Sequence, residues 1–165
     1  MDYQKIIDKY YPADDELRRV LLKHSRQVAD RALLIADRHP ELGVDRRFLE
    51  EAAMLHDIGI LRCDAPGIFC HGTEPYIMHG RIGADMLRQE GYERHARVAE
   101  RHTGTGLPGY EPETLEEQII CYADKFYSKS SPDHEKTVEE ACRSLRKFGE
   151  AGVVKLMEWA KRFEG

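Results

Sequence analysis

The chain has 165 residues and a formal net charge of −5 at pH 7, with 41% hydrophobic and 33% charged residues. Its length is that of about one domain, and its composition is that of a folded globular protein and not of a disordered chain. Because the charge is negative and Lys and Arg form no dense block, general binding to nucleic acid or to an acidic membrane surface is not expected.

The sequence also lacks the marks of a secreted or membrane protein. No stretch reaches the roughly 18 apolar residues that span a bilayer, and the N-terminus has no apolar signal core, so we expect a cytoplasmic protein. The four cysteines are scattered and form no CxxC pair, which favours reduced thiols over a disulfide framework. A zinc site made by Cys63, Cys70 and His71 is the alternative.

A long amphipathic helix is predicted from Asp14 to about Arg38. Apolar residues recur there at steps of three and four, and His24 falls on the same face, so its side chain should point inward. The apolar positions are Leu17, Val20, Leu21, Val28, Ala32 and Ile35.

A second helix is predicted over residues 48–55, and it leads into the pair His56 and Asp57. Gly59 weakens the helix directly afterwards, so the pair should lie near a helix C-terminus. Residues 62–77 contain several Pro and Gly residues and show no periodicity. We expect this segment to be an irregular loop that forms a lid or a pocket wall.

Two further helices are predicted, at 79–91 and 92–104, each ending at a glycine suited to a C-cap. His79 opens the first of them and His102 closes the second. After a Gly- and Pro-rich loop at 104–112, another apolar face contains Asp124.

The C-terminal segment is predicted to form helices from about Glu135 to Phe148 and from about Glu150 to Phe163. Its apolar side chains can bury against the core or against a second subunit, so a homo-oligomer is compatible with the sequence. No strand-like alternation or Asn-Gly hairpin is visible. The sequence therefore predicts a single all-α domain, a compact bundle of about six to eight helices.

The predicted helices carry six residues of metal-ligating types, at intervals that converge only through folding. Imidazole and carboxylate ligands suit several divalent metals, and a carboxylate can bridge two ions. Four His and two Asp are therefore enough for a binuclear site with positions left for water. The six residues are His24, His56, Asp57, His79, His102 and Asp124.

In order and spacing over residues 20–128, these segments resemble the HD-domain superfamily of metal-dependent phosphohydrolases, in particular its HDIG-type members. The matching segments are His24, HDIG at 56–59, His79, the RHTGTG sequence with His102, and the ADK sequence with Asp124. We expect one HD domain over residues 1–165, in which the resemblance covers the metal-binding core at about 20–128 and the apolar pattern alone predicts the C-terminal helices at about 135–163.

The resemblance also implies two metal sites that share Asp57. His24, His56 and Asp124 would complete the first site, and His79 and His102 the second. Iron or manganese is expected, and Co, Ni, Zn and Mg are also compatible with these donors. The implied reaction is hydrolysis of a phosphomonoester, phosphoanhydride or phosphodiester in a nucleotide or small phosphorylated metabolite by metal-activated hydroxide, with Asp57 as a catalytic residue.

The chain departs from the resemblance after HDIG, where many members have a Lys that contacts phosphate and this chain has Ile60. We therefore expect Arg62, Arg81 and Lys125 to bind the substrate. His71, in the expected lid, is the predicted proton donor to the leaving group.

Three other functions are compatible with the ligand pattern. Symmetrical hydrolases of diadenosine tetraphosphate are similar to this chain in ligand number and size. Some HD-domain proteins with the same six ligands are mixed-valent di-iron oxygenases, and a catalytically inactive regulatory module is the third alternative. Hydrolysis is the commoner activity in the family and is the leading hypothesis.

Overall fold

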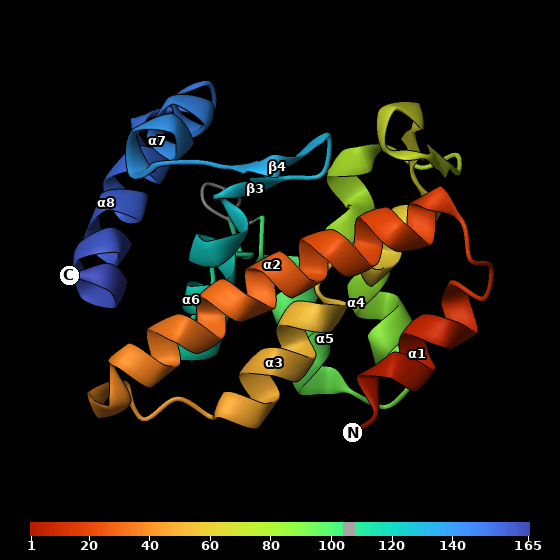
Figure 1. Cartoon of the computed structure of the whole chain (residues 1–165), viewed down its shortest axis with the longest axis horizontal. Helices are drawn as coiled ribbons and strands as arrows, with labels where there is room; N and C mark the ends of the chain where they lie inside the picture. Colours follow the sequence, from red (N-terminus) through yellow and green to blue (C-terminus); the bar gives the residue numbers. More distant parts are fainter. Residues whose placement is uncertain (104–107) are drawn as a thin grey trace.

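The computed structural model describes residues 1–103 and 108–165, and it is mostly helical (Figure 1). The predicted all-α class is confirmed, and no helix in these two ranges has the length and apolarity to cross a membrane. The glycine predicted to end the 92–104 helix and the start of the loop after it lie outside the described residues. The helices are α1 (Tyr3–Tyr10), α2 (Glu16–Arg38), α3 (Arg46–Leu55), α4 (His79–Gln89), α5 (Glu93–Arg101), α6 (Leu115–Asp124), α7 (Val138–Arg146) and α8 (Glu150–Glu164).

Side-chain caps define the beginning of several helices. The carboxylates of Asp15 and Asp45 accept hydrogen bonds from backbone amides in the first turns of α2 and α3. Thr114 and Glu117 form a capping box at the start of α6. These contacts satisfy amides that have no partner within the helix, and so they set where each helix starts.

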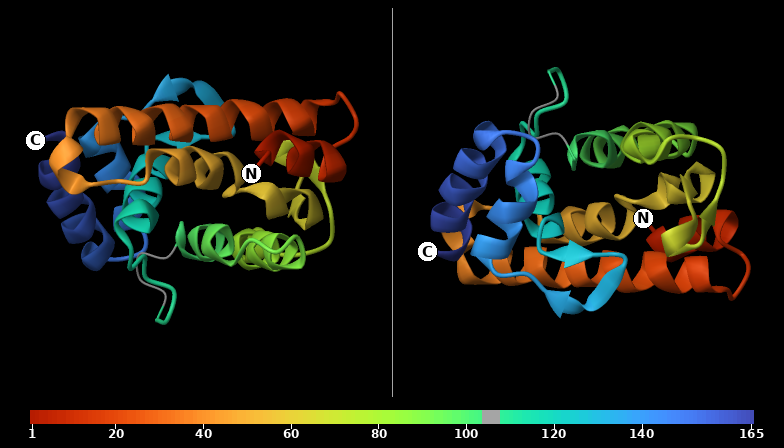
Figure 2. Two further views of the ribbon diagram at one scale, coloured as in Figure 1. Left: turned by 90° about the horizontal axis from the view of Figure 1, so that it is seen from below. Right: turned by 90° about the horizontal axis from the view of Figure 1, so that it is seen from above.

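The helix α3 lies between two layers (Figure 2). The long helix α2 packs on one side of α3, and the paired helices α4 and α5 lie on the other. Burial of a Leu or Ile side chain contributes about 1.5–3 kcal/mol, so the interior of this arrangement stabilises the relative positions of the helices. Its fully buried residues include Leu21, Val28, Leu49, Ala52, Leu55, Leu87, Ile119 and Ile120.

A close backbone contact joins α4 to the short 3₁₀-helix η2 (Ile58–Arg62). A Cβ atom on Gly59 would lie 2.4 Å from the carbonyl oxygen of His79 and 2.5 Å from the amide nitrogen of Gly83. Only a residue without a side chain permits this approach. Gly59 therefore sets the distance between Asp57, which precedes η2, and His79, which begins α4.

The expectation that the chain has no strands is wrong in detail. Strand β1 (Asp64–Ala65) pairs with β2 (Cys70–His71), and β3 (Tyr127–Ser128) pairs with β4 (Ser131–Glu135), both antiparallel. Strands β1, β2 and β3 have two residues each, and the five residues of β4 show no apolar alternation, which explains why the pattern does not reveal these strands. The other short elements are the 3₁₀-helices η1 (Pro40–Leu42), η3 (Pro66–Ile68) and η4 (Tyr76–Met78).

The C-terminal helices α7 and α8 pack against each other at one end of the molecule, and α8 also contacts α6. Helix α7 starts at Val138 and not at the predicted Glu135, because β4 continues to that residue. The sequence allowed the C-terminal apolar side chains to bury against the core or against a second subunit, and in the structure four of them are buried within this chain. They are Val153, Leu156, Trp159 and Phe163.

Candidate metal centre

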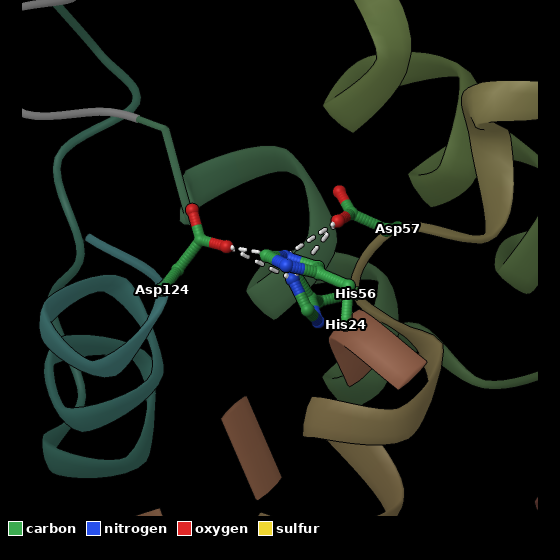
Figure 3. Close-up of side chains that lie close together, drawn as sticks. All are labelled: His24, His56, Asp57 and Asp124. Carbon is green, nitrogen blue, oxygen red and sulfur yellow. Dashed lines mark hydrogen bonds and ion pairs between the residues drawn. The ribbon is translucent and has the colours of Figure 1, made fainter. Parts of the chain in front are cut away.

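The six predicted ligand residues converge in the structure and form two sets that share Asp57. Within each set, the possible ligand atoms lie within 4.8 Å of one another. In the first set, the rings of His24 and His56 lie between two carboxylates (Figure 3). The first set is His24, His56, Asp57 and Asp124, and the second is Asp57, His79 and His102.

Most of these residues lie at helix ends, so the centre forms where the ends of several helices meet the inner face of α2. His24 is the exception, because it lies within α2 and is only 3% exposed. The remaining positions are the C-cap of α3 and the residue after it, the first residue of α4, the C-cap of α5 and the last residue of α6: His56, Asp57, His79, His102 and Asp124.

Three histidine rings are oriented by the same backbone contact. In each ring, Nδ1 lies close to the carbonyl oxygen three residues earlier, at 2.5 Å for His56, 2.5 Å for His79 and 2.6 Å for His102. Because a carbonyl oxygen only accepts, we assign the proton of the neutral ring to Nδ1. Nε2 then carries a lone pair directed into the centre, as metal-binding histidines require.

The second set contains a contact that needs a positive charge. The Nε2 atoms of His79 and His102 lie 3.0 Å apart, and each lies 3.2 Å from Oδ1 of Asp57. Neutral rings bonded to carbonyls through Nδ1 would direct two lone pairs and a carboxylate oxygen toward one region. Both oxygens of Asp57 also lie at ion-pair distance from neighbours without a well-directed hydrogen bond. The Nε2 lone pairs and the Asp57 oxygens therefore lack hydrogen-bond donors, and they are suitable ligands for a divalent metal.

The charges of the centre also favour binding of a cation. Burial opposes ionisation of Asp57, yet the charges of His56 and Lys129 hold its pKa well below the usual value. The side chain of Asp124 is 15% exposed, and burial raises its pKa, yet hydrogen bonds with His24 and His56 outweigh this effect and hold the pKa well below the usual value. Burial lowers the pKa of His56, but the carboxylate of Asp57 outweighs it and raises that pKa to about 10, so a metal ion would displace the proton from Nε2 of this ring. The two carboxylates therefore stay ionised and attract cations.

One residue of the centre has no counterpart in the sequence prediction. Lys129, from the turn between β3 and β4, places Nζ 2.8 Å from Oδ2 of Asp57, and its side chain is 11% exposed. Burial lowers the pKa of Lys129, but the Asp57 carboxylate outweighs it and holds the pKa well above the usual value. The missing Lys after HDIG, at Ile60, was the signal that a cation should come from another segment.

A pocket of about 240 Å³ opens beside His24. The first half of α2 forms one wall, and Phe69 from the predicted lid region forms another. Lys129 also lines the pocket and thereby connects it to the metal centre. The other lining residues are Glu16, Arg19, Val20, Lys23 and Pro132.

The three cationic residues predicted to bind substrate do not line this pocket. Arg62 and Arg81 are exposed, and the guanidinium of Arg81 lies 5.4 Å from the ring centre of Tyr110. Lys125 donates from Nζ to the carbonyl oxygen of His102 at 2.9 Å. This contact ties the end of α6 to a predicted metal ligand, while substrate binding by these cations stays a prediction.

The predicted proton donor, His71, is exposed on β2, where it pairs with Asp64. Its role in proton transfer stays a prediction. The alternative zinc site around it has little support, because within the described residues no metal-binding group combines His71 with the cysteines. Burial raises the pKa of Cys70 to about 11, which favours a protonated thiol.

Comparison with known proteins matches residues 21–128 to the model of the HD domain. A tRNA (cytidine(56)-2'-O)-methyltransferase of Picrophilus torridus is 30% identical over 150 residues, which cover 78% of this chain and 40% of that protein. An uncharacterized protein of Methanocaldococcus jannaschii is 34% identical over 121 residues, which cover 64% of this chain and 65% of that protein.

Ribonuclease Y of Alkaliphilus metalliredigens is 30% identical over 128 residues, which cover 78% of this chain and 24% of the ribonuclease. The chain thus spans less than half the length of the methyltransferase and about a quarter of the ribonuclease. No solved structure matches the chain significantly.

Proposed function

This chain belongs to the HD domain family, and on that basis we propose that it is a metal-dependent phosphohydrolase. The proposed substrate is a phosphomonoester, phosphoanhydride or phosphodiester in a nucleotide or a small phosphorylated metabolite. The observation that carries the proposal is the convergence of four His and two Asp into two sets of donors that share Asp57.

The donor atoms fit two divalent ions, for which iron and manganese are the proposed identities. His24, His56 and Asp124 would hold one ion together with Asp57. His79 and His102 would hold the second, also with Asp57. When bound, such ions supply Lewis-acid chemistry that lowers the pKa of water and stabilises negative charge on phosphoryl oxygens.

The residues of the chain would hold the two donor sets in position. Hydrolysis joins the oxygen of water to phosphorus and breaks the bond to the leaving oxygen, which takes up a proton. Asp57 is fully buried, with Oδ2 3.1 Å from His24 Nε2 and Oδ1 3.2 Å from His79 Nε2. Its two oxygens therefore face different donor sets and would hold them at a constant spacing.

A phosphodiester bond in RNA is the second candidate substrate. Two of the relatives are named as a ribonuclease and a tRNA methyltransferase, which favours a link to RNA. Since this chain covers only 24% and 40% of those proteins, their complete activities are not transferred to it. The net charge of −5 argues against a long contact with an RNA backbone, so the end of a strand is the more suitable substrate.

The test measures the products formed by the metal-loaded full chain, which are inorganic phosphate from p-nitrophenyl phosphate and nucleotides, and mononucleotides or shortened strands from a short single-stranded RNA. We expect Asp57→Asn to reduce turnover at least about 100-fold. Asp85→Asn is the matched control, because the Asp85 side chain is 77% exposed on α4. Full turnover in Asp57→Asn would overturn the proposal, and oxygen uptake without phosphate release would support the oxygenase alternative.

A further inference from the structure

The pocket beside His24 combines a cation, an aromatic ring and apolar walls next to the metal centre. We propose that this pocket binds one nucleotide unit, with Lys129 holding the phosphate beside the metal centre and Phe69 stacking on the base. The inference rests on the proposed phosphohydrolase function and names its substrate class. The nucleotide is either free or the terminal unit of a single strand.

Lys129 lies between the pocket and the donor atoms. Its amine is 2.8 Å from Oδ2 of Asp57, and the same side chain lines the pocket beside His24. A phosphate in contact with this amine would therefore lie next to the first donor set. Lysine offers a positive point charge with three donors, which suits a phosphate oxygen. Ile60, at the position where many family members have a phosphate-binding Lys, is fully buried and cannot supply this charge.

Phe69 adopts a conformation that is unfavourable for a residue with a side chain. Its φ of 66° is in the left-handed region, and within residues 1–103 and 108–165 no other non-glycine residue has a positive φ. The side chain is 42% exposed, so this strain does not serve burial in the core. An exposed ring on a pocket wall is a suitable platform for stacking on a base.

The rest of the pocket fits a nucleotide in chemistry and size. Val20 and Pro132 add apolar surface to the pocket lining, while the charges of Arg19 and Lys23 outnumber that of Glu16 there. The amine of Lys23 lies 2.7 Å from Asp133, but both side chains are exposed, and such pairs exchange readily for a ligand. The volume of about 240 Å³ is below the roughly 300–1,000 Å³ of pockets for drug-sized ligands, so the pocket has room for at most one unit and not for a duplex.

The experiment measures equilibrium binding to the metal-loaded full chain by calorimetry. The probes are a nucleoside 5′-monophosphate and ribose 5-phosphate, each used as its non-hydrolysable phosphonate analogue so that no turnover occurs, and inorganic phosphate. We expect Phe69→Ala to weaken binding of the mononucleotide about tenfold and to leave ribose 5-phosphate within about twofold, because only the base stacks. Phe69→Tyr should retain wild-type binding, and Phe148→Ala is the matched control, since Phe148 is 85% exposed on another part of the chain.

Lys129→Met is expected to weaken binding of all three probes about tenfold, while Lys129→Arg retains most of the affinity. Metal content and circular dichroism of each variant show whether the centre and the fold are intact. Lys136→Met, a lysine outside this pocket, should bind like the wild type. Unchanged probe binding in Lys129→Met with full metal content would overturn the assignment of the phosphate contact.

The two proposals fail differently. Equal affinity of the wild type for the mononucleotide and for ribose 5-phosphate overturns the nucleotide pocket, even if p-nitrophenyl phosphate is hydrolysed. Base-dependent binding without turnover of any phosphate overturns the phosphohydrolase function and leaves the pocket. If a single-stranded oligoribonucleotide binds more tightly than the mononucleotide, the unit in the pocket is the end of a strand and not a free nucleotide. Tighter binding of duplex RNA than of either would overturn the pocket.

Discussion

The Nε2 atoms of His79 and His102 face each other at 3.0 Å, while Nδ1 of each ring contacts the carbonyl oxygen three residues earlier. Each Nε2 is also 3.2 Å from Oδ1 of the buried Asp57. Neutral rings in this arrangement present lone pairs to one point, which is favourable only with a cation nearby. The backbone at two helix ends thus prepares the second donor set before any metal binds.

Replacing His102 by Ala should therefore remove one metal equivalent and retain the other, since the first donor set has its own four residues. Phosphate release should decrease at least about 100-fold. Plasma mass spectrometry gives the stoichiometry, and a phosphate assay gives the rate. His134→Ala is the control, because His134 is exposed and bonded to Glu140. Two equivalents of metal in the His102 variant would show that the second site is placed wrongly.

Gly59→Ala tests the contact between η2 and α4. The added Cβ would lie 2.4 Å from a backbone oxygen, so we expect a loss of about 1–3 kcal/mol in the free energy of unfolding. Gly67→Ala is a matched substitution with no atom within 4 Å of its added Cβ, and it should change stability by less than about 0.5 kcal/mol. Urea unfolding measures both, and equal midpoints would contradict the packing role of Gly59.

Lys125→Met tests whether Lys125 stabilises the fold through its backbone contacts or binds the substrate, as the sequence analysis expects. Its amine donates to the carbonyl oxygens of His102 and Cys121, at 2.9 and 3.2 Å. Loss of these bonds should cost about 1–3 kcal/mol of stability and weaken binding of one metal, with little change in substrate KM. Urea unfolding, metal titration and steady-state kinetics give the three readouts. A KM raised about tenfold with unchanged stability would instead support substrate binding by Lys125.

The capping box of α6 predicts a pH dependence of stability. Burial raises the pKa of Glu117, but hydrogen bonds from the amides of Glu113 and Thr114 and the charge of Arg97 outweigh it, so the pKa is lower than its ordinary 4.5. The unfolded chain then binds the proton more tightly. The stabilisation is complete above pH 4.5 and is lost as the pH falls through the folded-state pKa.

The free energy of unfolding of the wild type minus that of Glu117→Gln should therefore decrease between about pH 6 and about pH 3. The glutamine keeps the shape of the cap and cannot ionise. Urea unfolding at a series of pH values measures the difference, in which contributions from other carboxylates cancel. A difference that stays constant over this range would contradict the assignment.

The sequence predicted the helices and the convergence of the ligands because both depend on residue type and spacing. The apolar stripe of α2 placed His24 inward, and the residue is 3% exposed in the structure. The pair His56 and Asp57 was expected near a helix C-terminus, which is where α3 ends. These features follow from the helical period and from glycine near helix ends.

Lys129 and Phe69 could not be assigned from the sequence. Lys129 reaches Asp57 only because the β3–β4 turn folds back over the centre, and in sequence it looks like a polar loop residue. The left-handed conformation of Phe69 has no local signal, because glycine or asparagine usually occupies that region. Arg62 and Arg81 were chosen from their positions in the sequence near predicted ligands, and their binding of substrate stays a prediction.

The most direct test of the central claim is the metal content of the full chain. Plasma mass spectrometry of protein purified without added metal, and of the same protein after reconstitution, gives the metal and its amount per chain. The two donor sets predict two equivalents of a divalent metal, with iron or manganese as the expected ion. A chain that binds no metal after reconstitution with Fe, Mn, Co, Ni or Zn would contradict the account.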